Sequence, residues 1–138
     1  MNQKFTRAGL MMIALIAQLS MQAFNVTFRV DMSQQSDFTT PEVNGSFNSW
    51  CGNCFQMTDA DGDNIWEATT NLASGNYEYK FSADGWGSQE SLLQGSPCTV
   101  TNFGFTNRSL VVTGDVVLPV VCKAKTKGNI IEFFSLTN

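Results

Sequence analysis

The chain has 138 residues, of which 43% are hydrophobic and 14% charged, enough apolar material for one domain with its own core. The net charge is −4, and the stretch from Phe24 to Cys122 carries eleven acidic but only three basic residues. That stretch lacks the basic surface that nucleic acids and anionic membranes attract, so we expect neither as a partner. The sequence contains no histidine, which excludes Ser-His-Asp and Cys-His catalysis and most zinc hydrolase sites.

The first 23 residues have the pattern of a secretory signal peptide. Lys4 and Arg7 precede an apolar run over residues 8–19, and the small residue Ala23 ends the segment. The alternative, a transmembrane anchor, is disfavoured because the run is too short. We therefore expect a signal peptide over 1–23, a folded domain over 24–122 and a tail over 123–138, in a protein that is secreted or lies at the cell surface or in the periplasm.

Beyond the leader, apolar and polar residues alternate, as they do in β-strands with one buried face. Strands are predicted near residues 26–31, 42–47, 65–70, 77–82, 110–112 and 116–118. Turn signals such as Asn44-Gly45, Ser74-Gly75 and Asp84-Gly85 recur at short intervals, and no long window has helical spacing. The pattern predicts an all-β protein, an immunoglobulin-like β-sandwich.

Two tryptophans, Trp50 and Trp86, each end a short polar loop, and Lys80 lies between them on the outward side of a predicted strand. A pyranose ring offers apolar C–H faces to an indole and hydroxyl groups to polar side chains, so these three residues favour a sugar-binding surface. The alternative is that both indoles fold back over the core, as large aromatic side chains usually do. Trp66, inside a predicted strand, is expected to belong to the core.

The four cysteines, Cys51, Cys54, Cys98 and Cys122, are expected to form disulfides in an exported protein. Three pairings exist, and we favour Cys51–Cys54 with Cys98–Cys122. The first would clip one loop, and the second would tie the last strand region to the domain. A four-cysteine zinc site is disfavoured because the chain has only one C-x-x-C spacing.

Residues 50–54 read W-C-G-N-C, which is similar to the thioredoxin active-site motif, where a helix N-terminus activates the first thiol. That chemistry needs a helix after the motif. Residues 55–64 run instead into an aspartate-rich turn. We therefore interpret the two cysteines as a structural clip, and a thiol redox enzyme as the least favoured function.

The aspartate-rich turn spaces Asp59, Asp61 and Asp63 two residues apart, a pattern found in calcium-binding loops. It departs from the EF-hand loop, because Asn64 stands in the place of its glycine and Thr70 in the place of its closing glutamate. These aspartates are candidate calcium ligands, and no other cofactor is expected. A hairpin turn built on the Asp-Gly pair is the alternative interpretation.

Three segments resemble one known family. Residues 43–50 (VNGSFNSW) resemble the GSFNNW segment of the glycogen-binding domain of the AMP-activated protein kinase β subunit. Residues 75–86 (GNYEYKFSADGW) resemble that domain's G-x-YKF-x-DG-x-W stretch, and residues 104–108 (GFTNR) resemble its closing G-x-x-N segment. The N-terminal starch- and glycogen-binding modules of branching enzymes are similar too.

The resemblance implies an early-set immunoglobulin-like sandwich that binds α-glucans without catalysis. Carried over by position, Trp50 and Trp86 would stack on glucose rings, while Lys80 and Asn107 would hydrogen-bond sugar hydroxyls. We expect a secreted, non-enzymatic module for a polysaccharide or oligosaccharide such as glycogen or starch, alone or in a larger extracellular assembly. The alternative is a structural or adhesive β-sandwich that contacts another protein and has no glycan ligand.

Overall fold

The structure, a computed structural model, describes residues 22–122. The predicted tail over 123–138 and nearly all of the predicted signal peptide lie outside these residues and stay predictions. The first strand already begins at Ala23. Within the described part of the chain, no helix has the length and hydrophobicity needed to cross a membrane.

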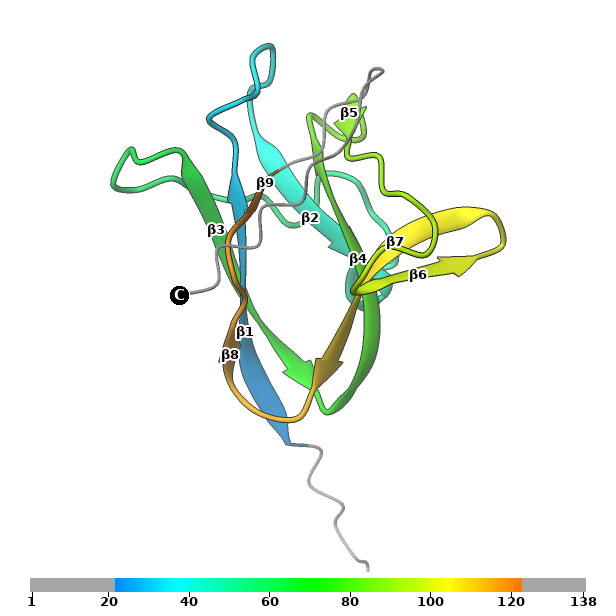
Figure 1. Ribbon diagram of the computed structural model, residues 1–138. Helices are drawn as coiled ribbons and strands as arrows, with labels where there is room; N and C mark the ends of the chain where they lie inside the picture. Colours follow the sequence, from blue (N-terminus) through cyan, green and yellow to red (C-terminus); the bar gives the residue numbers. More distant parts are fainter. Residues whose placement is uncertain (1–21, 123–138) are drawn as a thin grey trace, which may run out of the picture.

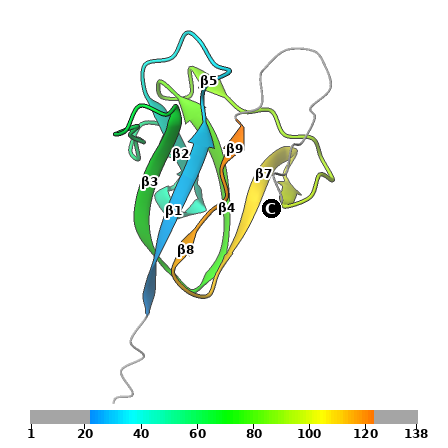
Figure 2. The same ribbon diagram turned by 60° about the vertical axis from the view of Figure 1, so that its left-hand side comes forward.

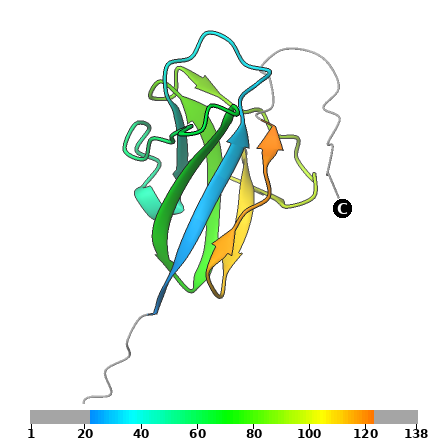
Figure 3. The same cartoon turned by 90° about the vertical axis from the view of Figure 1, so that its left-hand side faces the viewer.

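The described strands form two sheets that lie face to face (Figure 1). The first sheet has the order β3 (Ile65–Ala73), β1 (Ala23–Asp31) and β8 (Val116–Val117), with β9 (Val121–Cys122) also pairing with β1. The second has the order β2 (Pro41–Gly45), β4 (Gly75–Ala83), β7 (Phe105–Val112) and β6 (Thr99–Asn102), with β5 (Ser88–Gln89) pairing with β4. Figure 2 shows the two layers obliquely, and Figure 3 turns the first sheet toward the viewer. The predicted all-β sandwich is confirmed.

The core lies between the sheets, where the alternation predicted it. Val26, Phe28 and Val30 of β1 are fully buried, and Tyr79 and Phe81 of β4 face them from the second sheet. The ring centroids of Phe28 and Tyr79 lie 5.0 Å apart. Burial of these large apolar side chains on facing sheets is the main force that holds the sandwich together.

The strand predicted over 42–47 ends earlier, and the turn predicted at Asn44-Gly45 is wrong. Gly45 is extended, with φ −166°, and pairs with Tyr79, while Ser46–Asn48 form a short 3₁₀ helix, η1. A Cβ atom at position 45 would lie 2.5 Å from the Glu78 carbonyl oxygen. Glycine is therefore needed here for the close approach of two backbones, not for a turn.

The cysteine prediction is half right. Cys51 and Cys54 form a disulfide, but Cys98 carries a free, exposed thiol, so the predicted Cys98–Cys122 disulfide is wrong. A disulfide between the two sheets would need Cys98 to face the interior of the sandwich, and Cys98 is exposed. Cys98 precedes β6 at the edge of the second sheet, whereas Cys122 ends β9, which pairs with β1 in the first sheet.

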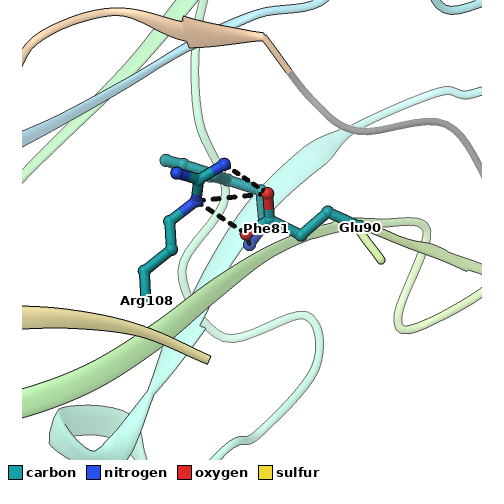
Figure 4. A network of polar contacts seen from close by, with 3 residues as sticks. All are labelled: Phe81, Glu90 and Arg108. Carbon is teal, nitrogen blue, oxygen red and sulfur yellow. Dashed lines mark hydrogen bonds and ion pairs between the residues drawn. The ribbon is translucent and has the colours of Figure 1, made fainter. Parts of the chain in front are cut away.

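A buried ion pair fixes the loop after β5 to the second sheet (Figure 4). The side chain of Glu90 is fully buried and accepts hydrogen bonds from Arg108 Nη2 at 2.7 Å and Arg108 Nε at 2.9 Å. It also accepts the Phe81 N–H at 3.0 Å, and the Arg108 guanidinium lies over the Phe81 ring at 5.6 Å. Loop, β4 and β7 are thereby joined at one point.

Candidate functional site

A groove of about 560 Å³ is lined by all four residues for which the sequence predicted sugar contacts: Trp50, Lys80, Trp86 and Asn107. The remaining lining residues are Ser46, Glu78, Gln89, Asn102, Phe103 and Phe105. Because Tyr79 and Phe81 of β4 point into the core, Lys80 points to the opposite face of the same strand. The groove therefore lies on the outer face of the second sheet.

The loop that carries Trp50 is built by its own motif. Asn48 accepts the Gly45 N–H at 2.9 Å and donates its amide to the Val43 carbonyl at 3.1 Å. The Trp50 N–H donates to the Gly45 carbonyl at 3.1 Å, and Phe47 packs against the aromatic core. These contacts make a tight corner at the end of β2, which places Trp50 at the groove on the outer face of the sheet.

Trp86 is carried by the turn Asp84–Gly87 between β4 and β5. The Asp84 carboxylate accepts the Thr40 N–H at 2.9 Å and the Thr39 N–H at 3.0 Å, which ties the turn to the start of β2. The Gly85 N–H donates to the carboxylate of Glu42 at 2.8 Å. Trp86 is thus held on a turn with several anchors rather than on an unsupported loop.

The two indole rings are neighbours. Their centroids lie 6.5 Å apart with an angle of 32° between the ring planes, and Trp86 Nε1–H donates to the Trp50 carbonyl at 3.3 Å. Both side chains are half-buried and line the groove, so they do not fold back over the core. Trp66, by contrast, packs against the core beside Phe38, as predicted.

Both groove tryptophans have left-handed backbones, with φ 57° at Trp50 and φ 73° at Trp86. Residues other than glycine rarely adopt this conformation, and each instance costs about 1–3 kcal/mol. Such strain persists only where surrounding contacts impose it, and it is concentrated at functional sites. Eight non-glycine residues of the described chain have a positive φ, and three of them, Trp50, Trp86 and Phe103, line the groove.

Lys80 has a buried stem and an ammonium group at the groove; its side chain and backbone together are 9% exposed. Among residues 22–122, the ammonium has no hydrogen-bond or salt-bridge partner. Burial lowers the pKa of Lys80 below its usual value, and the nearby Glu90 carboxylate partly opposes this effect. The ammonium therefore offers donors to a ligand.

The Asn107 side chain is hydrogen-bonded to a residue that the sequence analysis did not single out. Glu78, on the same face of β4 as Lys80, accepts hydrogen bonds from the Asn107 amide at 2.9 Å and from the Asn102 amide. The Asn107 amide is thereby oriented, and within the described region its Oδ1 has no partner. An acceptor and the Lys80 donors thus line one groove, which suits a hydroxyl group that both donates and accepts.

Sequence reasoning also missed two aromatic residues. Phe103 is fully exposed and Phe105 is 68% exposed, and both line the groove from the β6–β7 hairpin, which extends away from the sandwich (Figure 1). Gly104 between them has φ 85° and makes the turn. The available signal was the F-G-F pattern, two large aromatics beside a turn glycine.

The aspartate-rich turn brings its three carboxylates together. One oxygen from each of Asp59, Asp61 and Asp63 lies within 4.8 Å of the others. Asp59 also accepts backbone N–H groups of its own loop, and paired backbone hydrogen bonds between Thr58 and Glu67 close the loop, as in the hairpin interpretation. The calcium site stays a prediction, which a calcium-dependent rise in melting temperature would test.

Residues 39–98 match carbohydrate-binding module 48, the isoamylase N-terminal domain. The resemblance to this family is confirmed. Carbohydrate-binding module 48 is a non-catalytic binding module with an immunoglobulin-like fold, in agreement with the sandwich found here. The match spans Trp50, Lys80 and Trp86 and supports a carbohydrate-binding module with a carbohydrate partner. A search of curated proteins found no match to the chain.

Proposed function

We propose that this protein is a secreted, non-catalytic module that binds α-glucans of the glycogen and starch class in the groove of the second sheet. One observation carries the proposal. Trp50, Lys80, Trp86 and Asn107 come from two loops and two strands, yet they line the same groove. The two indoles are 6.5 Å apart and form a continuous aromatic platform.

The geometry of the platform supports an α-glucan. The α-1,4-linked chain coils, so that successive sugar rings present inclined faces, whereas a β-1,4-linked chain is flat. The 32° angle between the Trp50 and Trp86 rings matches inclined rather than coplanar faces. With stacking worth about 1 kcal/mol per ring, a single groove of this kind binds in about the upper micromolar to millimolar range.

The proposed location outside the cytoplasm has two supports. The leader over residues 1–23 has the charge and hydrophobicity of a signal peptide. The Cys51–Cys54 disulfide lies on the surface, where it persists only in an oxidising compartment.

Affinity electrophoresis in gels that contain glycogen or amylose tests the function. The wild-type protein is expected to be retarded, and Trp50→Ala and Trp86→Ala are expected to migrate as in a gel without polysaccharide. Thr69→Ala, on the opposite sheet, serves as the control and keeps the retardation. Unretarded wild-type protein, indistinguishable from Trp50→Ala, would remove the proposal. A gel containing a soluble cellulose derivative checks the preference for α-linkage.

A second candidate function, an adhesive contact with another protein, is favoured by the exposure of Phe103 and Phe105. Exposed neighbouring aromatics are typical of protein interfaces as well as of sugar platforms. Iodide quenching of tryptophan fluorescence separates the two functions. Protection of the tryptophans by maltoheptaose supports the glucan site, and quenching that the sugar leaves unchanged supports the adhesive contact.

A further inference from the structure

Beneath the two tryptophan loops lie three polar side chains that have no role in the groove itself. Glu42 and Asn44 project from β2, and Ser82 lies beside them on β4, where its backbone pairs with Glu42. Their exposures are 1%, 0% and 1%. On the outer face of a sheet such residues normally meet water; here the loops cover them. Buried polar groups are costly unless they are hydrogen-bonded, so the pattern of their bonds is informative.

The three side chains form one chain of hydrogen bonds. The Asn44 amide donates to the Ser82 hydroxyl at 2.8 Å, and the Ser82 hydroxyl donates to the Glu42 carboxylate at 3.0 Å. At one end, Asn44 Oδ1 accepts the Gly52 N–H at 2.9 Å. At the other end, Glu42 Oε1 accepts the Gly85 N–H at 2.8 Å.

The two ends of this chain lie beside the two tryptophans. Gly52 follows Trp50 by two residues, and Gly85 directly precedes Trp86. Gly52 also supports the second ring directly, because a Cβ at that position would lie 3.0 Å from Cδ1 of Trp86. A shift of Gly52 would therefore displace both parts of the aromatic platform.

We propose that Glu42, Ser82 and Asn44 are positioning residues that set the distance and tilt between the Trp50 and Trp86 rings. This inference rests on the proposed function, because glucan binding is the purpose that the geometry of the two rings would serve. The hydrogen bonds that hold this geometry do not depend on that function. A connected buried network acts as a unit, so removal of its central hydroxyl is felt at both ends. The left-handed backbones of Trp50 and Trp86 need such outside support.

The test compares Asn44→Ala, Ser82→Ala and Glu42→Ala with the control Ser109→Ala, which removes an exposed hydroxyl from β7 of the same sheet. Hydrogen exchange of single amides, followed by NMR, gives the first readout. Gly52 should exchange faster in Asn44→Ala, Gly85 in Glu42→Ala, and both in Ser82→Ala. The indole N–H resonance of Trp86, whose acceptor belongs to Trp50, gives the second readout and should move in all three, while that of Trp66 stays in place.

Binding of maltoheptaose gives the third readout. Each network variant loses a buried hydrogen bond, so its dissociation constant for maltoheptaose is expected to rise about tenfold. The dissociation constant of Ser109→Ala is expected to stay unchanged. Glu42→Gln keeps an acceptor for Gly85 and is expected to restore the slow exchange of that amide and most of the affinity. This conservative variant also covers the case in which Glu42→Ala does not fold.

The results separate the two proposals. Unchanged exchange of Gly52 and Gly85 and an unmoved Trp86 indole in the folded variants would overturn the positioning role, even if affinity fell. A wild-type protein that binds no glucan while the exchange pattern appears as expected would contradict the proposed function and leave the positioning role supported.

Discussion

Lys80 is the residue at which the needs of the fold and of the site conflict. Its stem is buried on the outer face of β4, and its ammonium group, which has no partner in the described region, has its pKa lowered by the surrounding protein, so the charged form is unfavourable for folding. The same absence leaves all its donors for a ligand. A residue that costs stability and offers unpaired donors beside two strained tryptophans is typical of a binding site rather than of a scaffold.

Replacement of Lys80 should separate these two effects. Lys80→Met removes the charge and keeps the stem, so the melting temperature is expected to stay level or rise. The dissociation constant for maltoheptaose should weaken about tenfold through the lost charge-assisted hydrogen bonds. Thermal unfolding and titration calorimetry measure the two quantities. A clear loss of stability would contradict this account of the site.

Because the pKa of Lys80 differs between the folded and unfolded states, the free energy of unfolding should depend on pH. Burial lowers this pKa below the usual value of 10.5, which the unfolded chain retains. Between the two pKa values the unfolded state binds more protons, so the free energy of unfolding rises with pH there. Urea unfolding below pH 10 should show this rise in the unfolding free energy of the wild-type protein. The unfolding free energy of Lys80→Met should not show it.

At the scale of the elements, two loops present the tryptophans of the site, and hydrogen bonds fix both loops to the strands of the second sheet. The corner after β2 presents Trp50, and the β4–β5 turn presents Trp86. Each is fixed to β2 by hydrogen bonds, through Asn44 for the first and Glu42 for the second. The Cys51–Cys54 disulfide adds a covalent clip directly beside Trp50. Preorganised loops bind more tightly because less conformational freedom is lost on binding.

The clip should therefore matter more for binding than for folding. The disulfide closes a loop with a sequence separation of 3, and its loss in the double variant Cys51→Ser/Cys54→Ser is expected to cost about 2 kcal/mol of unfolding free energy at most. Both cysteines are exposed, so the new hydroxyls meet water. Retardation in glycogen gels should decrease clearly. Unchanged retardation would mean that hydrogen bonds alone hold the Trp50 loop.

At the scale of the whole molecule, the sandwich supplies a rigid support for a shallow site. Tyr79 lies at its centre, with its ring 5.0 Å from Phe28 of the first sheet and 5.7 Å from Phe81 of the second. Because Tyr79 is an inward-facing residue of β4, its side chain packs in the apolar core. Stability of the entire fold is consequently coupled to the ionisation of one core residue.

This coupling predicts a specific alkaline unfolding. Burial raises the pKa of Tyr79 from 10.0 to about 12. Between these values the folded state holds a proton that the unfolded state releases, so the free energy of unfolding falls as pH rises, by about 2–3 kcal/mol over the interval. Urea unfolding between pH 10 and 12 measures the fall. Tyr79→Phe should lack most of it, and an equal fall in that variant would assign it to other groups.

The sequence by itself determined the approximate positions of six strands, the inward faces of β1 and β4 and four of the residues that line the groove, whereas β5, β6 and β9 were not predicted. Period-two alternation is a local property, and it placed Val26, Phe28 and Val30 correctly in the core. The family motifs around Trp50 and Trp86 likewise identified positions that the groove brings together. The turn predicted at Asn44-Gly45 was wrong because Gly45 is needed for the close approach of the neighbouring strand β4. No local sequence pattern reveals such an approach.

Only the tertiary structure decided which distant residues meet. The fold left Cys98 exposed with a free thiol at the edge of the second sheet, so the predicted disulfide with Cys122 did not form. Loops folded over the outer face of β2 and β4 and buried the polar residues Glu42, Asn44 and Ser82 in one network. The physical reason is the same in each case: alternation fixes which side of a strand a residue occupies, but strand order and loop paths fix what covers that side.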